Sequence, residues 1–237
     1  MKKPVVGITF NWYKNDESRT PSYGKWLFGL NQSYAKLLAA ADVVPVGIIP
    51  TSKDVRSILD TVDMILLTGG PDPDPALYGQ KLNGSIGCYR ERPLWEMELY
   101  RIARSMKIPV FGVCLGIQLI AVAEGEQLIQ DISTQVDDPV DHDGKADDPR
   151  KHTVKIIDGT FLGKILGCEI EVCSFHHQSI AGIPKGYRLA AESQDGVIEA
   201  MESDDGLVVA VQWHPERDFT GPLILRNLIT RYFGDSD

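Results

Sequence analysis

The sequence predicts an α/β fold with a mostly parallel central sheet and a small antiparallel addition. In the first half of the chain, short apolar runs alternate with helical patterns, the arrangement that builds a parallel sheet from βαβ units. From Thr153 the hydrophobic period changes to two, which is typical of antiparallel strands. No linker, internal repeat or low-complexity tract divides the 237 residues, so we expect a single domain over residues 1–237.

The chain begins with alternating strands and helices. Val5–Thr9 predicts a strand, Asn31–Ala41 a helix rich in alanine and leucine, and Val43–Ile49 the next strand. Between the first two lies a long polar and aromatic loop, Asn11–Gly29. Its aromatic side chains could line the mouth of a pocket or form an oligomer contact, and the latter would allow a homodimer. The alternative is that they pack against the edge of their own domain. These aromatic residues are Trp12, Tyr13, Tyr23, Trp26 and Phe28.

A second strand and helix pair leads to a glycine-rich loop. Thr51, with Asp54 three residues later, predicts a capped helix over Lys53–Leu59, and Val62–Leu67 predicts a strand buried on both faces. The loop that follows, residues 68–79, begins with Thr-Gly-Gly-Pro. Glycines at the carboxyl end of a parallel strand allow backbone N–H groups to face a ligand crevice. The alternative is an ordinary turn with surface prolines.

Another helix is predicted over Arg92–Met106, with Pro93 in its first turn. The spacing of its apolar residues predicts an inner face. These residues are Leu94, Met97, Tyr100 and Ile102. A buried strand, Pro109–Val113, follows this helix and is succeeded with almost no loop by a helix over Leu115–Glu124.

Gly112-Val-Cys114-Leu-Gly116, at this strand-to-helix junction, has the G-x-nucleophile-x-G pattern of a nucleophile elbow. Its glycines stand where side chains would collide across a tight turn. We expect Cys114 to project into solvent from the sheet edge, at a helix N-terminus that stabilises a thiolate. The alternative is an inert cysteine acting as a small buried hydrophobe.

The second half of the chain changes character. Residues 134–152 are dense in aspartate and predict a solvated loop whose spacing does not match a calcium-binding EF-hand. Short helices are predicted over Thr160–Leu166 and, closing the chain, Pro222–Phe233. The predicted strands of the antiparallel addition are Thr153–Ile157, Glu169–Ser174, Tyr187–Glu192, Val197–Glu202 and Leu207–Gln212.

Composition excludes several classes of partner. The net charge of −9 argues against nucleic acid and anionic membranes, and no apolar run approaches a membrane span. The four cysteines show no zinc-site spacing, and no export signal is recognisable. We therefore expect reduced thiols, a cytoplasmic protein, no metal, no cofactor and a small-molecule partner.

A cysteine nucleophile needs a base and a group that orients the base. His214 follows a buried strand as Cys114 does, and Glu216, beyond a rigid proline, can reach its imidazole. His176 and His177 follow another strand and are rival bases, but no carboxylate lies near them in sequence. The remaining histidines, His142 and His152, flank the acidic loop and are expected at the surface.

Taken together, the elbow, the Gln212-Trp-His-Pro-Glu216 segment and the Gly69-Gly70 loop resemble class I glutamine amidotransferases. Four further segments are similar to the γ-glutamyl-γ-aminobutyrate hydrolase (peptidase C26) subfamily. They are residues 69–79 (GGPDPDPALYG), 130–131 (QD), 174–178 (SFHHQ) and 195–200 (DGVIEA). The resemblance covers nearly the whole chain. It implies a flavodoxin-like, three-layer αβα domain that works without a synthetase partner.

The resemblance also implies roles for individual residues. Cys114 would be the nucleophile, His214 the general base and acid, and Glu216 the residue that orients His214. The oxyanion hole would consist of the backbone N–H groups of Gly70 and Leu115. Gln118 would contact the glutamyl group of a γ-glutamyl amide substrate. The backbone of Ser174, Phe175 and His176 would hold the α-amino or α-carboxylate end of that group.

The chain departs from the subfamily pattern at several positions without losing a catalytic atom. Leu115 stands where arginine is frequent, and Cys173 where asparagine is frequent; both bear on which amine is released. The other departures are at Arg92-Pro93, Ala121 and Gly125-Glu126. Two other functions are compatible with the sequence: an amidotransferase subunit that passes ammonia to a separate synthetase, and a catalytically silent binding protein on the same scaffold.

Overall fold

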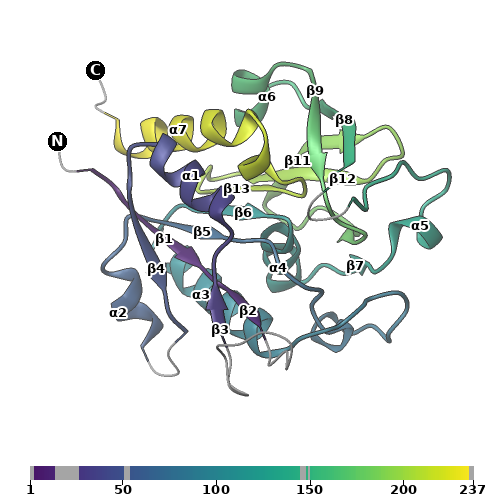
Figure 1. Cartoon of the computed structure of the whole chain (residues 1–237), viewed down its shortest axis with the longest axis horizontal. Coiled ribbons are helices and arrows are strands. Elements are labelled where there is room, and N and C mark those ends of the chain that lie inside the picture. The colour runs from purple at the N-terminus through teal and green to yellow at the C-terminus, as the bar shows by residue number, and fades with distance from the viewer. Residues whose placement is uncertain (1–2, 14–26, 51–53, 145–147, 149, 235–237) are drawn as a thin grey trace.

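A single nine-stranded sheet runs through the protein in a computed structural model that describes residues 3–13, 27–50, 54–144, 148 and 150–234 (Figure 1). Its strands are β1 (Val5–Thr9), β4 (Val44–Ile48), β5 (Met64–Leu67), β6 (Val110–Val113), β8 (Arg150–Ile156), β9 (Glu169–Ser174), β11 (Tyr187–Ser193), β12 (Ile198–Ser203) and β13 (Val208–Val211). They lie in the order β4-β1-β5-β6-β13-β12-β11-β8-β9. The predicted α/β class is confirmed.

The sheet changes direction at β13. From β4 to β13 all neighbouring strands are parallel, whereas β13–β12, β12–β11, β11–β8 and β8–β9 are antiparallel. The antiparallel strands therefore extend the parallel sheet instead of forming a separate layer. Strands β5, β6 and β13 are buried along their whole length, which explains why their sequences are continuously apolar.

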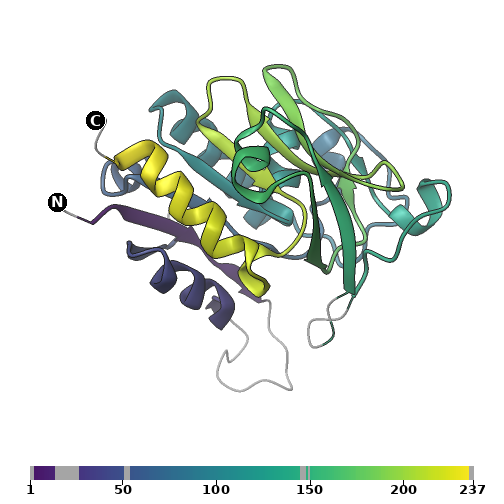
Figure 2. The ribbon, with the colours of Figure 1, turned by 90° about the horizontal axis from the view of Figure 1, so that it is seen from above.

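Helices cover both faces of the sheet. The helices are α1 (Gln32–Ala40), α2 (Val55–Leu59), α3 (Glu91–Ser105), α4 (Leu115–Ala123), α5 (Ile132–Gln135), α6 (Phe161–Leu166) and α7 (Thr220–Phe233), with 3₁₀ turns η1 (Pro75–Tyr78) and η2 (Pro215–Arg217). One apolar core includes α1, α6 and α7, and a second, on the opposite face, includes α2, α3 and α4. Figure 2 shows α7 lying beside α1. In the described part of the chain no helix has the length and apolar character needed to span a bilayer.

The predicted loop over Asn11–Gly29 contains a hairpin at its two ends. β2 (Asn11–Tyr13) pairs with β3 (Leu27–Gly29), and the Trp12 and Phe28 rings meet edge to face with centroids 5.3 Å apart. Such cross-strand aromatic pairs stabilise a short hairpin that alternation alone does not reveal. Tyr23 and Trp26 lie outside the described residues. A second short pair, β7 (Leu128–Ile129) with β10 (Ser179–Ile180), was not predicted because two residues carry no period.

Two predicted helices differ in detail. Helix α2 (Val55–Leu59) is capped by Asp54, whose side chain accepts a hydrogen bond from the Ser57 amide at 2.9 Å. Lys53, the predicted first residue, lies outside the described residues. Thr51, the predicted cap, lies outside the described residues.

The predicted inner face of α3 is confirmed at Met97 and Tyr100 but is wrong at Leu94. Leu94 is 49% exposed, whereas Arg92 and Glu96 are buried beside Met97 and Tyr100. The first turn of this helix faces the backbone carbonyl groups of Thr68 and Gly69. Arg92 donates hydrogen bonds to both and therefore takes a buried position on the inner side of the helix.

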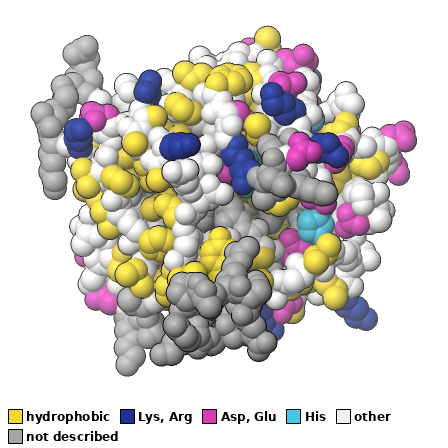
Figure 3. Space-filling model, viewed as in Figure 1, with side chains coloured by type: hydrophobic (Ala, Val, Ile, Leu, Met, Phe, Trp, Pro, Cys, Tyr) yellow, Lys and Arg dark blue, Asp and Glu magenta, His cyan; other side chains and the backbone are white. Residues whose placement is uncertain are grey.

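The acidic segment, residues 134–152, is only partly a solvated loop. Its start belongs to α5 and its end to β8, and His142 between them is buried. On the face drawn in Figure 3, Lys and Arg side chains are scattered among acidic ones and form no continuous patch over the described residues.

Candidate active site

Three neighbouring parallel strands end at the same edge of the sheet. Strand β5 leads into Gly69-Gly70, β6 into Cys114, and β13 through Gln212 and Trp213 into His214. The register pairs Leu67 with Gly112 and Val113 with Val211, so the three segments emerge side by side. The order of strands in the sheet thus joins segments that are far apart in the chain.

Cys114 occupies a strained turn. Its backbone has φ 52° and ψ −104°, a conformation that a residue with a side chain rarely adopts, and α4 starts at the next residue. A Cβ atom on Gly116 would lie 2.7 Å from the Leu67 carbonyl oxygen, and one on Gly112 would lie 3.0 Å from the Gly116 backbone. The flanking glycines are therefore required by close backbone packing.

The prediction that the Cys114 side chain projects into solvent was wrong. Cys114 is only 6% exposed, but it lines a cavity of about 920 Å³ and so stays accessible from that side. The turn places the cysteine side chain on the wall of this cavity. It is therefore neither fully exposed nor sealed in the core.

His214 faces the same cavity and is held by Glu216. The Nδ1–H of the imidazole donates to Oε1 of Glu216 at 2.8 Å, whereas Nε2 makes no hydrogen bond with a described residue. A Cβ atom added to Gly69 would lie 3.0 Å from Cε1 of His214 and 3.5 Å from Cβ of Cys114, so both side chains pack against one point. Burial by itself would lower the pKa of His214, but the charges of Cys114 and Glu216 outweigh it and raise the pKa to about 10.

The loop between β5 and α3 is fixed from two sides. The Gly69 N–H donates to the Tyr34 hydroxyl at 2.9 Å, and its carbonyl accepts from Nη1 of Arg92 at 3.1 Å. Arg92 also donates to the Thr68 carbonyl at 2.9 Å and pairs with the buried Glu96 at 2.8 Å. Tyr34 and Arg92 were not predicted as site residues, because their partners are backbone atoms of a distant loop.

The cavity extends from Cys114 to the β2–β3 hairpin. Its lining includes Gly69, Gly70 and Gln118 near Cys114 in the fold, and Trp12 and Tyr13 of the hairpin. Nε2 of His177 lies 2.9 Å from Oδ2 of Asp72. This hydrogen bond links the segment after β9 to the glycine loop. That hydrogen bond to Asp72 is the main cause that raises the pKa of His177.

The other predicted site residues are placed as follows. Phe175, His176 and Gln118 line the cavity, and Gln118 donates to the Gln178 carbonyl at 3.3 Å. Ser174 is fully buried outside the lining and donates from Oγ to the His142 carbonyl at 2.7 Å. The backbone N–H of His176 donates to the same carbonyl at 3.0 Å. The Leu115 side chain is buried, while its backbone opens the first turn of α4.

Two expectations about the remaining histidines were wrong. The side chains of His142 and His152, expected at the surface, are only 1% and 6% exposed. They converge with His176 on Glu199 of β12, a carboxylate 23 positions beyond His176 in the chain. The sheet pairing of β8, β11 and β12 brings these residues together, so no local signal could reveal the cluster.

This cluster is distinct from the Cys114 and His214 pair. Burial lowers the pKa of His176, while histidine neighbours hold the pKa of Glu199 well below its usual range in spite of its burial. His142 lies between Glu199 and Asp195, whose charges raise its pKa against the effect of burial.

The chain is similar to known proteins in sequence and in fold. The family model described as Peptidase C26 matches residues 4–216. A protein of Mycobacterium tuberculosis, provisionally named a glutamine amidotransferase, is 33% identical over 96% of this chain and 74% of its own length. The Escherichia coli K12 γ-glutamyl-γ-aminobutyrate hydrolase PuuD is 27% identical over 91% of this chain and 87% of its own.

Solved structures share the fold at lower identity. A glutamine amidotransferase of Thermotoga maritima matches with a TM-score of 0.57 and 12% identity, over 98% of this chain and 92% of that one. A glutamine amidotransferase of Methylobacillus flagellatus matches with a TM-score of 0.58 and 20% identity, over 98% of this chain and 76% of that one. These likenesses support the three-layer arrangement of helices around a mixed sheet.

Proposed function

The chain belongs to the peptidase C26 family, a glutamine amidotransferase-like hydrolase family, and from this premise we propose that it hydrolyses the γ-glutamyl amide bond of a γ-glutamyl amine. The observation that carries the proposal is the placement of Cys114 and the His214–Glu216 pair at the ends of adjacent strands in one cavity. A thiol nucleophile, a base and a group that orients the base are the parts that amide cleavage through a thioester requires.

In the proposed mechanism the first step is acylation. We take the Cys114 thiolate as the nucleophile, because a neighbouring imidazolium favours a thiolate and the pKa of His214 is raised to about 10. The sulfur attacks the γ-carbonyl carbon, and the carbonyl oxygen becomes an oxyanion held by the N–H groups of Gly70 and Leu115. Each such donor contributes roughly 3 kcal/mol to the transition state in comparable enzymes. His214 then gives its proton to the departing amine.

In the second step water removes the glutamyl group. Neutral His214 takes a proton from the water as its oxygen attacks the thioester carbonyl, and the same two N–H groups again hold the oxyanion. Collapse releases glutamate, and the thiolate and imidazolium are restored. Glu216 keeps the imidazole in the tautomer that presents Nε2 to the cavity throughout.

The size of the cavity favours an amine larger than ammonia. Its volume of about 920 Å³ reaches from Cys114 to the apolar side chains of Trp12, Tyr13 and Leu27 on the β2–β3 hairpin. We propose that the glutamyl group lies on the inner side near Gln118 and that the amine lies toward the hairpin. Aminobutyrate, a polyamine and an aromatic amine are candidate leaving groups, and a cytoplasmic location remains part of the proposal.

The decisive experiment is a screen of the purified protein over a panel of γ-glutamyl amines and glutamine, with free glutamate as the readout. The proposal expects cleavage of at least one γ-glutamyl amine without any added partner, and faster turnover of it than of glutamine. Activity on glutamine alone would instead support the second candidate, an ammonia-supplying amidotransferase subunit. That candidate is favoured by the amidotransferase name of the 33% identical mycobacterial relative. No release of glutamate from any substrate would contradict both.

A further inference from the structure

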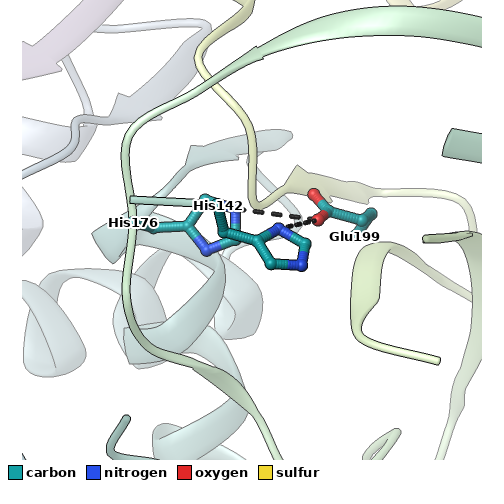
Figure 4. A group of neighbouring side chains, drawn as sticks. All are labelled: His142, His176 and Glu199. Carbon is teal, nitrogen blue, oxygen red and sulfur yellow. Dashed lines mark ion pairs between the residues drawn. The ribbon is translucent and has the colours of Figure 1, made fainter. Parts of the chain in front are cut away.

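The His142, His176 and Glu199 side chains form a buried cluster on the antiparallel side of the molecule, behind the wall of the cavity. Figure 4 shows the two imidazoles directed at the carboxylate of Glu199. The His142 residue comes from the segment before β8, His176 from the segment after β9, and Glu199 from β12. One nitrogen or oxygen atom of each residue lies within 4.8 Å of the others.

The two imidazoles approach Glu199 closely without making hydrogen bonds to it. Oε1 of Glu199 lies 3.2 Å from Nδ1 of His142 and 3.6 Å from Nε2 of His176, and neither nitrogen makes a hydrogen bond with a described residue. Ligands of a tetrahedral zinc ion, with bonds of about 2.0–2.1 Å, are separated by roughly 3.3 Å. The two observed separations lie on either side of that value.

Each of the three residues has one outer hydrogen bond that orients it. Nε2–H of His142 donates to Asp195 at 2.9 Å, and Nδ1–H of His176 donates to the Gln178 carbonyl at 3.1 Å. The carboxylate of Glu199 accepts from Nε2–H of His152 at 3.0 Å. Histidines that bind metals almost always donate their other ring N–H to a carboxylate or carbonyl in this way.

These outer bonds fix which atoms face inward. When the two rings are neutral, these outer bonds keep the proton on Nε2 of His142 and on Nδ1 of His176, so that the lone pairs of the other two nitrogens face the carboxylate of Glu199 in a buried region. Oε1 of Glu199 has a donor in His152, but the lone pairs of the two histidine nitrogens have none among the described residues, an arrangement that a cation bound between the three residues would relieve. A proton on His142 would satisfy one contact, but Nε2 of His176 would still have no donor.

The charge balance points the same way. Glu199 and Asp195 contribute two negative charges, and among the described residues only histidines lie within ion-pair distance of either carboxylate. A divalent cation would neutralise the cluster while all three histidines remain uncharged. Two imidazoles and a carboxylate are a donor set suited to zinc.

We infer that His142, His176 and Glu199 bind one divalent transition-metal ion, zinc by its donor set, in a site that is separate from Cys114. The ion fastens the segment before β8 and the segment after β9 to β12. Since His176 lies between Phe175 and His177 in the cavity lining, the ion would also hold that wall in place. This inference does not depend on the proposed amide hydrolysis.

Cys114 and His214 could also capture zinc, so the test removes that thiol first. The Cys114→Ser protein is stripped with a chelator, dialysed against excess Zn²⁺, desalted and analysed for bound metal. We expect about one Zn²⁺ per chain. We expect a rise of about 5–10 °C in the unfolding midpoint when zinc is present at roughly a hundred times its dissociation constant. Both effects should disappear in Cys114→Ser/Glu199→Gln and Cys114→Ser/His176→Ala.

A matched control and a direct structural readout accompany these variants. Cys114→Ser/His177→Ala changes the adjacent histidine, which bonds to Asp72 outside the cluster, and should still bind zinc. X-ray absorption of the Zn²⁺-loaded Cys114→Ser protein should show imidazole scattering and only nitrogen and oxygen ligands. This measurement needs no cluster variant and therefore holds even if those variants fail to fold. A Cys114→Ser protein that retains no zinc would overturn the inference.

Discussion

The guanidinium group of Arg92 lies beneath the glycine loop and donates from Nη1 to the carbonyl oxygen of Gly69 at 3.1 Å. Nη2 donates to the Thr68 carbonyl and Nε donates to Glu96. All three guanidinium nitrogens of this buried side chain therefore make hydrogen bonds. A planar fork fixes two successive carbonyl groups at once, which a lysine cannot do. Arg92 therefore acts as a positioning residue for the backbone that precedes the Gly70 N–H.

We expect Arg92→Lys to lower kcat about 10- to 100-fold with a smaller change in KM, because a displaced oxyanion donor affects the transition state more than substrate binding. Lysine keeps the positive charge beside Glu96, so the protein should still fold. Steady-state kinetics on the best γ-glutamyl amine measure the effect. Arg101→Lys, on the exposed side of α3, is the control and should be silent. Equal kcat values for Arg92→Lys and the unchanged protein would show that the loop is held by other contacts.

Replacing the proposed nucleophile should abolish turnover without unfolding the chain. We expect Cys114→Ala to reduce kcat by about 10⁴-fold or more and to prevent labelling by a diazo ketone analogue of glutamine. Cys168→Ala, which alters an exposed cysteine, should keep both activity and labelling. The site of labelling is read by peptide mass spectrometry. A Cys114→Ala protein that remains fully active would remove the proposed mechanism.

The proton affinity of His214 should depend on its two neighbours. Its pKa is raised to about 10 against the lowering effect of burial, because the charges of Cys114 and Glu216 favour the imidazolium. In Cys114→Ser and in Glu216→Gln the pKa should therefore fall, as measured by NMR titration of the ring carbons. A titration midpoint that is the same in all three proteins would mean that His214 does not face either group.

The same shift has a consequence for stability. The pKa of His214 is higher in the folded chain, about 10, than its ordinary value of 6.5, so its stabilising contribution is complete below pH 6.5 and is lost as the pH rises toward 10. Urea unfolding at several pH values should show that Glu216→Gln loses more stability at pH 6.5 than at pH 10. The opposite trend would contradict the direction of the shift.

The close packing of the elbow predicts a contrast between two glycines. Gly116→Ala would place a Cβ 2.7 Å from a backbone carbonyl, so we expect a loss of about 1–3 kcal/mol in unfolding free energy and a displaced Cys114. Gly182→Ala meets only the flexible end of Glu126 at 3.0 Å and should change stability little. Denaturant melts of both variants provide the comparison. Equal losses would show that the elbow tolerates a side chain.

The α/β class, the order of most helices and strands, and the elbow around Cys114 were all predictable from the sequence. These features depend on local properties: hydrophobic period, continuous apolar runs in β5, β6 and β13, and glycines at fixed spacing. His214 and Glu216 could also be predicted as site residues, because they directly follow the apolar run of β13 and the end of such a run marks the end of a strand.

Tertiary structure alone decided which distant side chains meet. Arg92 bonds to a loop more than twenty residues earlier, Tyr34 bonds to the same loop from α1, and His142, His152 and His176 converge on Glu199 across the antiparallel strands. Strand pairing and helix docking set these contacts, and neither leaves a periodic trace around the residues involved. A buried charged or polar group needs a partner, and the partners of these histidines come from other strands; for that reason His142 and His152 were expected at the surface.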